Sequence, residues 1–219
     1  MSTSGNQPIQ KVSPRSEDLL FLLTAPSNEK IQHFILQQRH SVFSYAEVGA
    51  TAGDAPAQYN LDRNSIVLGR GAATWRRAVQ AVREWKMFEI PWVRLCRPTA
   101  ETRAGADVAI LVHHFGFYSL NACRIVYVVD DDGPLARYGF AYGTLADHGE
   151  CGEERFTVEW NSVDDVVSYS MLAFSRPNKT LSKLGYPFSR ALQRKFAVAS
   201  KAAMFAAANV NEERLHSTV

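Results

Sequence analysis

Six strand-length segments follow one another in the middle of the chain, with no helix-length pattern between them. They are residues 92–96, 107–115, 123–129, 137–142, 154–160 and 166–174. Turn-forming residues separate them, most clearly in the run Asp130-Asp131-Asp132-Gly133-Pro134. Strands joined by short links pair as hairpins, because a parallel crossover needs a dozen or more residues and usually a helix. We therefore expect one antiparallel sheet.

Helical patterns lie on both sides of this block. Ser27 is a candidate N-cap for a first helix, and a short strand at 65–68 precedes a second helix that begins after Gly71. The longest pattern covers 187–211, where Phe188, Leu192, Phe196, Ala199 and Ala203 share one face. The second half of that segment is nearly all alanine. Such a smooth face either packs closely on the sheet or leaves free volume above it.

Composition places these elements in one domain. A chain of 219 residues with 46% hydrophobic content can bury one core. Residues 1–18 are polar and predict a disordered tail, and 19–219 predict a single domain with an N-terminal helical extension at 19–62. The long connection at 41–62 should be ordered, because its aromatic residues need cover.

Charge and cysteine usage exclude several classes of protein. A net charge of +2 does not favour nucleic acid or a polybasic membrane anchor, and no apolar run is long enough to span a bilayer. Cys96, Cys123 and Cys151 are odd in number and widely spaced, which favours a reducing compartment over a disulfide framework. The N-terminus does not read as a secretory signal. We expect a soluble cytoplasmic protein.

Several segments resemble a known but uncharacterised family. They read NSIVLGRG, NACRIVYVVDDDG, RYGFAYGTLADHGECGEERFTVEW, MLAFSRP and GYPFSRALQRKF. Together they look like the DUF1990 family, which is grouped with the START and birch-pollen-allergen-like (SRPBCC) superfamily. The resemblance implies a helix-grip α+β fold, a curved antiparallel sheet of six to seven strands around a long C-terminal helix. The family carries no established reaction, so the resemblance assigns no catalytic roles.

Strand parity predicts which side chains face the interior, because successive residues point to opposite faces of a sheet. Tyr138, Phe140 and Tyr142 share one face, and Glu154 and Phe156 share one face of the next strand. The alternate set, Glu153 to Glu159, reads as facing solvent. Glu154 is therefore an acid on an apolar face. Burial there would raise its pKa unless a cation pairs with it, and Arg124 and Arg176 are candidate partners.

A cavity between the sheet and the final helix is the leading hypothesis for a binding site. Its predicted lining consists of Tyr138, Phe140, Tyr142, Glu154, Phe156, Phe196 and Ala203, with Arg124, His113 or His114, and Arg176 as polar contacts. For Glu154 taken by itself, a structural ion pair at a strand end is favoured over a functional carboxylate. For the inward histidine, a hydrogen-bonded core residue is favoured over a functional role.

Familiar catalytic and cofactor motifs are missing from the sequence. His148 and Cys151 form a loose H-x-x-C without a second ligand pair, so no metal is expected. Gly69-Arg70-Gly71 lacks the third glycine of a dinucleotide fingerprint and reads as a tight turn, so no cofactor is expected. Neither a serine elbow nor a supported cysteine nucleophile is present.

Three hypotheses for function follow. The first is a protein that binds a small apolar or amphipathic ligand in the cavity. The second is a cyclase- or hydrolase-like enzyme that uses Glu154 in the same cavity. The third is a ligand-free interaction module that uses the basic helix face at 70–103 or the connection at 41–62.

Overall fold

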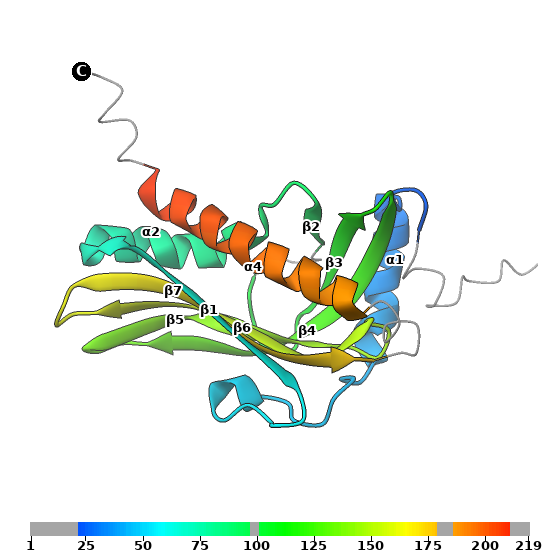
Figure 1. Cartoon of the computed structure of the whole chain (residues 1–219), viewed down its shortest axis with the longest axis horizontal. Helices are drawn as coiled ribbons and strands as arrows, with labels where there is room; N and C mark the ends of the chain where they lie inside the picture. Colours follow the sequence, from blue (N-terminus) through cyan, green and yellow to red (C-terminus); the bar gives the residue numbers. More distant parts are fainter. Residues whose placement is uncertain (1–21, 97–100, 179–185, 211–219) are drawn as a thin grey trace, which may run out of the picture.

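The computed structural model describes residues 22–96, 101–178 and 186–210, and its centre is a seven-stranded sheet (Figure 1). The strands are β1 (Asn60–Arg70), β2 (Val93–Cys96), β3 (Asp107–His114), β4 (Phe117–Asp131), β5 (Leu135–Thr144), β6 (Glu150–Asn161) and β7 (Val166–Pro177). Their order is β1-β7-β6-β5-β4-β3-β2, and every neighbouring pair is antiparallel. The predicted antiparallel sheet is confirmed. The predicted tail at 1–18 lies outside the described residues.

In the described part of the chain, three helices pack on this sheet. They are α1 (Asn28–Gln37), α2 (Gly71–Arg83) and α4 (Tyr186–Asn209), with short 3-10 turns η2 (Gln38–His40), η3 (Ala50–Ala52) and η4 (Lys86–Phe88). The Ser27 hydroxyl accepts a hydrogen bond from the Lys30 amide at 3.2 Å, so the expected N-cap of α1 is present. The turn before α2 needs Gly71, whose φ of +83° suits a residue without Cβ. The helix-grip fold is thus observed, with α4 running across the sheet (Figure 1).

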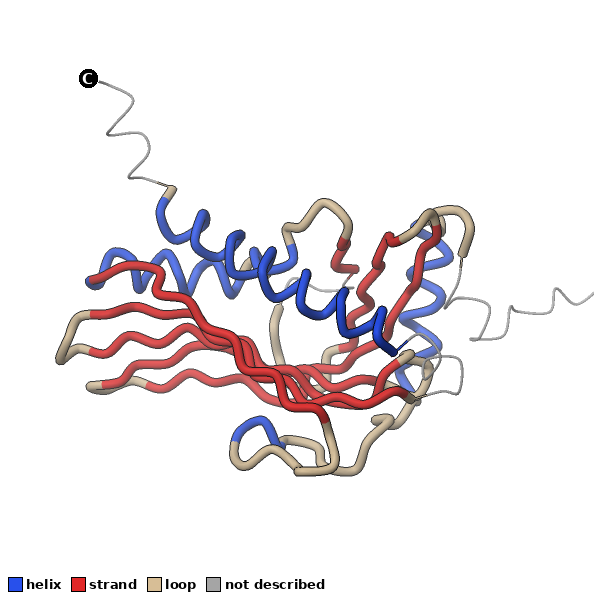
Figure 2. The backbone as a smooth tube through the Cα atoms, viewed as in Figure 1, coloured by secondary structure: helices blue, strands red, loops and turns tan. Residues whose placement is uncertain are grey.

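The outer face of the sheet is covered by the N-terminal part of the chain. Ile31, Phe34 and Ile35 of α1 pack against Leu111 and Leu120 of β3 and β4. Further along, the connection that carries η3 lies on the side of the sheet opposite α4 (Figure 2). Its aromatic residues Tyr45 and Tyr59 are 6% and 8% exposed, so the expectation of an ordered connection was right.

This cover corrects one sequence-based expectation. Glu153 and Thr157 lie on the face of β6 that was predicted to meet solvent, yet each is only 2% exposed. The Glu153 carboxylate accepts hydrogen bonds from the Tyr45 hydroxyl at 2.7 Å, from the Gly49 amide at 2.7 Å, and from the amide and hydroxyl of Thr51. Polarity along the strand predicted exposure, whereas a distant segment supplies donors and buries the acid.

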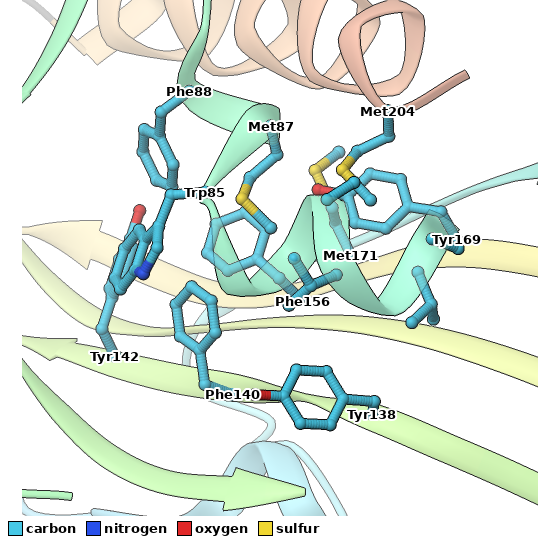
Figure 3. Packing of buried hydrophobic residues seen from close by; sticks show 14 of the residues in the cluster. Trp85, Met87, Phe88, Tyr138, Phe140, Tyr142, Phe156, Tyr169, Met171 and Met204 are labelled. Carbon is cyan, nitrogen blue, oxygen red and sulfur yellow. The ribbon is translucent and has the colours of Figure 1, made fainter. Parts of the chain in front are cut away.

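The inner face is packed solid at one end. Trp85 packs against Phe140 with 4.1 Å between the ring centroids and 35° between the ring planes, and the centroid of Phe156 lies 5.5 Å from that of Phe140. Figure 3 shows the three rings together. Above them α2 and the second half of α4 close the layer, with Met204 and Ala208 fully buried. The Arg77 guanidinium donates to the Ala208 carbonyl and ties the two helices together. The alanine-rich half of α4 therefore packs closely, which is one of the two arrangements that its sequence allowed.

Candidate functional site

A cavity lies under the first half of α4, at the other end of the inner face. Its volume is about 1100 Å³, and it is partly open to solvent. Apolar side chains from β3, β7, α4, the end of η4 and the residue before β2 form most of the wall: Phe88, Trp92, Ile110, Val112, Met171, Phe188, Leu192 and Phe196. Polar side chains come from the strands below: Asp62, Asn64, His114, Ser119, Asn121, Tyr142, Glu150 and Glu154. This combination of an apolar wall with a few polar groups is typical of small-molecule sites.

Glu154 is a half-buried acid in this wall, beside Tyr142. The Tyr142 hydroxyl donates a hydrogen bond to Glu154 Oε2 at 2.9 Å across the β5–β6 pair. Burial raises the Glu154 pKa to about 7, the Tyr142 hydrogen bond opposes the rise, and the negative charges of Asp62 and Glu150 add to it. No ion pair to Glu154 occurs within the described ranges. The carboxyl group therefore exchanges a proton near neutral pH.

Two further acids lie at the same end of the cavity, and both have partners. Asp62 of β1 forms a two-pronged ion pair with Arg190 of α4, with the second contact at 2.7 Å. The Gln193 amide donates to Glu150 Oε2 and, at 3.1 Å, to the Ser175 hydroxyl. Burial raises the pKa of Glu150, while Ser175, Arg190 and Gln193 counteract that rise. These contacts fasten the first turns of α4 to the sheet.

The two histidines at the cavity favour the neutral state. Burial lowers the pKa of His148 to about 4, and its Nδ1 accepts a hydrogen bond from the Glu150 amide at 2.9 Å. Burial, and then the charge of His113, lower the pKa of His114, whose Nε2 lies 3.3 Å from the Ser119 hydroxyl. His114 Nδ1 is buried and has no hydrogen-bond partner among the residues that the structure describes. Neither ring is therefore expected to place a positive charge in the cavity at neutral pH.

Four of the residues expected at the site do line the cavity: Tyr142, Glu154, His114 and Phe196. Tyr138, Phe140 and Phe156 lie on the same inner face, but they belong to the packed end (Figure 3). Parity placed them on the correct side of the sheet. It could not tell which end of that side is hollow. Ala203 is half-buried in the second half of α4, away from the lining, because the hollow lies under the first half.

The remaining three expected contacts are on the outer face, which corrects their assignment. Arg124 pairs with Asp107 at 2.6 Å and donates to the carbonyl oxygen of Gln38 at 2.9 Å, so it holds η2 at its first residue. The guanidinium of Arg176 lies 4.7 Å from the centre of the Tyr59 ring. His113 is exposed and stacks on Tyr118 at 4.4 Å. None of the three reaches Glu154, because their strand positions point away from it.

Sequence reasoning missed Asp62, Glu150, Arg190 and Gln193. Asp62 and Glu150 were overlooked because β1 and β6 both begin several residues before their predicted starts. The alternation of Asp62, Asn64 and Ile66 with exposed residues was the available signal. Arg190 and Gln193 read as polar positions off the helix stripe. Only the angle at which α4 crosses the sheet brings them to the acids.

The chemistry open to this site is proton exchange and the binding of polar groups. In the described parts of the chain, no group of three or more His, Cys, Asp or Glu side chains could hold a metal ion. Across those same parts, no helix is both long and apolar enough to cross a membrane. Cys96, Cys123 and Cys151 are all buried and unpaired. Burial raises the pKa of Cys96 and Cys123, which makes these two thiols poor nucleophiles.

Comparison with known sequences identifies relatives. A family model described as "Domain of unknown function (DUF1990)" matches residues 44–203. A UPF0548 protein of Dictyostelium discoideum is 35% identical over 216 residues, which cover 90% of this chain and 100% of the relative. A UPF0548 protein of Deinococcus radiodurans is 36% identical over 192 residues, which cover 81% of this chain and 93% of the relative.

Solved structures give more distant similarities. Ara h 8.0201 matches with a TM-score of 0.43 and 10% identity, covering 68% of this chain and 99% of its own. Human STARD10 matches with a TM-score of 0.42 and 10% identity, covering 89% of this chain and 86% of its own. Similarity at this level concerns the path of the chain and nothing finer.

Proposed function

The chain belongs to the DUF1990 family, and we propose that it binds one small amphipathic molecule in the cavity beneath the first half of α4. The supporting observation is the hollow of about 1100 Å³, which has apolar walls and the Glu154–Tyr142 pair on the sheet side. Ligand sites of this kind have volumes of roughly 300–1,000 Å³, so there is room for a molecule of drug size.

The contrast between the two ends of the inner face supports this proposal. Protein interiors are normally close-packed, and empty apolar space costs stability. At one end Trp85, Phe140 and Phe156 fill the layer. At the other end the same sheet and helix leave a hollow, and Asp62–Arg190 and Gln193–Glu150 hold α4 above it. Because the same sheet and helix pack tightly at one end, we interpret the hollow at the other end as space for a ligand.

The test is native mass spectrometry of the full chain purified from its own host. We expect one small molecule to travel with the protein. The neutral fluorophore N-phenyl-1-naphthylamine should bind the emptied protein with a blue-shifted emission. Ala173→Phe puts a ring into the cavity wall and should abolish both signals. Val163→Phe, at a position 88% exposed in the β6–β7 turn, is the matched control and should preserve them. Absence of both signals in the unaltered chain would refute the proposal.

A second candidate function, acid–base catalysis in the same cavity, rests on a specific observation. Glu154 has a pKa of about 7 and lies 2.9 Å from the Tyr142 hydroxyl, within reach for proton transfer. Such a carboxyl group can donate or accept a proton at neutral pH. Incubating the co-purified molecule with fresh protein separates the two functions. A chemical change that stops in Glu154→Gln supports an enzyme, and an unchanged molecule contradicts it.

The third hypothesis, a ligand-free interaction module, stays a prediction. The same native spectra distinguish it, because a protein partner would appear as a much larger added mass. The three unpaired cysteines agree with a reducing compartment, which is why we place the protein in the cytoplasm within this proposal.

A further inference from the structure

Within the described residues, Glu154 of the cavity wall has no ion-pair partner, and this points to the chemistry of the ligand. We propose that the ligand carries a protonated amine that pairs with the Glu154 carboxylate, while its apolar part lies against Phe88, Met171 and Phe196. This inference rests on the proposed function of the cavity and specifies the class of molecule that it takes.

The first step of the argument compares the three acids at this end of the cavity. Asp62 has a full positive charge beside it, from Arg190. Glu150 has the Gln193 amide and the Ser175 hydroxyl nearby, and Arg190 also stabilises its charge. Glu154 accepts one hydrogen bond from a neutral phenol, within the described residues. The protein thus provides partners for two of these acids and leaves the third facing the hollow.

The second step concerns the other groups that face Glu154. Tyr142 and Cys123 stay protonated, because burial and the Glu154 charge both raise their pKa values. His114 and His148 favour their neutral forms. Arg63 and Arg194 line the cavity but are exposed, so their charges are screened by water. The two charged groups that act on the Glu154 pKa, Asp62 and Glu150, are both negative.

The third step is the consequence for a ligand. A carboxylate in a poorly solvated site gains most from a partner that brings a full positive charge and several N–H donors. A primary ammonium group has three donors and can bond to Glu154 while it faces Asn64 or Asn121 in the same wall. A ligand carboxylate or phosphate would add a further negative charge beside Glu154 and Glu150, and like charges at this spacing repel. An alcohol could bond to Glu154 without neutralising it.

The experiment uses three probes with the same eight-carbon tail: n-octylamine, 1-octanol and octanoate. Each displaces N-phenyl-1-naphthylamine from the full chain at about pH 8, where an alkylamine is still largely protonated. We expect octylamine to bind about tenfold more tightly than octanol, because a hydrogen bond between charged groups is worth more than a neutral one. Octanoate should bind most weakly of the three.

Two variants locate the preference. Glu154→Gln should bring octylamine to within about twofold of octanol, because the charge is gone and the shape is kept. Glu159→Gln, on the same strand but outside the cavity lining, should keep the preference. If either variant fails to fold, the relative affinities of the three probes for the unaltered chain still test the amine proposal.

The outcomes separate the two proposals. Equal binding of octylamine and octanol, or tighter binding of octanoate, would overturn the amine and leave a cavity-binding protein. A preference for octylamine that survives Glu154→Gln would also overturn it. Failure of every probe, together with an empty native spectrum, would overturn both.

Discussion

Glu153 and Glu154 are neighbours in β6, but their carboxyl groups lie on opposite faces of the sheet and in opposite environments. The Glu153 carboxylate is enclosed by four donors from the segment around η3. The Glu154 carboxylate faces a cavity and accepts one hydrogen bond, from Tyr142. One strand thus carries an acid that the fold satisfies and an acid that it leaves available.

This difference separates structure from function at the level of single side chains. A buried charge costs free energy unless donors or cations satisfy it, and Glu153 meets that condition. Glu154 does not meet it. A residue that departs from the rule that buried charges are satisfied is a candidate for function. The comparison therefore predicts opposite responses when the two charges are removed.

The largest effect is expected on the outer face. Glu153→Gln replaces one acceptor oxygen with an amide that faces donors, so we expect a loss of about 3 kcal/mol in the free energy of unfolding. Chemical denaturation measures it. Glu159→Gln, six residues further along the same face of β6, is the matched control and should change stability by less than about 0.5 kcal/mol. A similar small loss in both variants would show that the Glu153 contacts contribute little.

The second-largest loss of stability is expected at Gly143, where the Tyr45 hydroxyl lies close to the sheet. A Cβ at Gly143 would lie 2.0 Å from the Tyr45 hydroxyl oxygen. Gly143→Ala must therefore displace the hydroxyl that donates to Glu153, at a cost of about 2 kcal/mol in unfolding free energy. Gly53→Ala is the control, since nothing lies within 4 Å of its Cβ position. Combining Gly143→Ala with Glu153→Gln should cost less than the sum of the two, because both break the same contact.

On the inner face the expected change in stability has the opposite sign, because removing the Glu154 charge should stabilise the protein. The Glu154 pKa is about 7 in the folded protein and about 4.3 in an unfolded chain, so the folded state holds the proton more tightly. The unaltered protein should then lose stability as the pH rises through this window. Glu154→Gln cannot lose a proton. It should be more stable than the unaltered chain by about 1 kcal/mol at about pH 8 and equal to it near pH 4, with allowance for water in the cavity. A less stable Glu154→Gln at the higher pH would place Glu154 in the same structural class as Glu153.

The smallest effect tests the phenol beside Glu154. Tyr142→Phe removes the hydrogen bond that lowers the Glu154 pKa, so that pKa should move further upward. Carbon-detected NMR titration of the glutamate carboxyl groups measures the shift. Stability at acid pH should change by less than about 1 kcal/mol, because one hydrogen bond at a cavity wall is lost. An unchanged Glu154 pKa would show that the Tyr142 hydroxyl does not influence this carboxyl group.

The elements and their pairing could be derived from the chain alone. Alternation of side chains and turn residues such as Asp130 to Pro134 are local signals, and local signals define strands and hairpins. The same alternation put Tyr142 and Glu154 on the inner face, and the final helix was found from its repeat. Strand ends were less certain, so Asp62 and Glu150 were missed.

The location of the hollow and the state of each acid depended on contacts between distant segments. Arg124 was expected beside Glu154, but it binds the Gln38 carbonyl of η2 on the outer face. Glu153 read as exposed until the segment around η3 covered it. Alternation along a strand assigns a side chain to a face. What covers that face, and how closely, comes from residues a hundred positions away, and no local pattern contains that information.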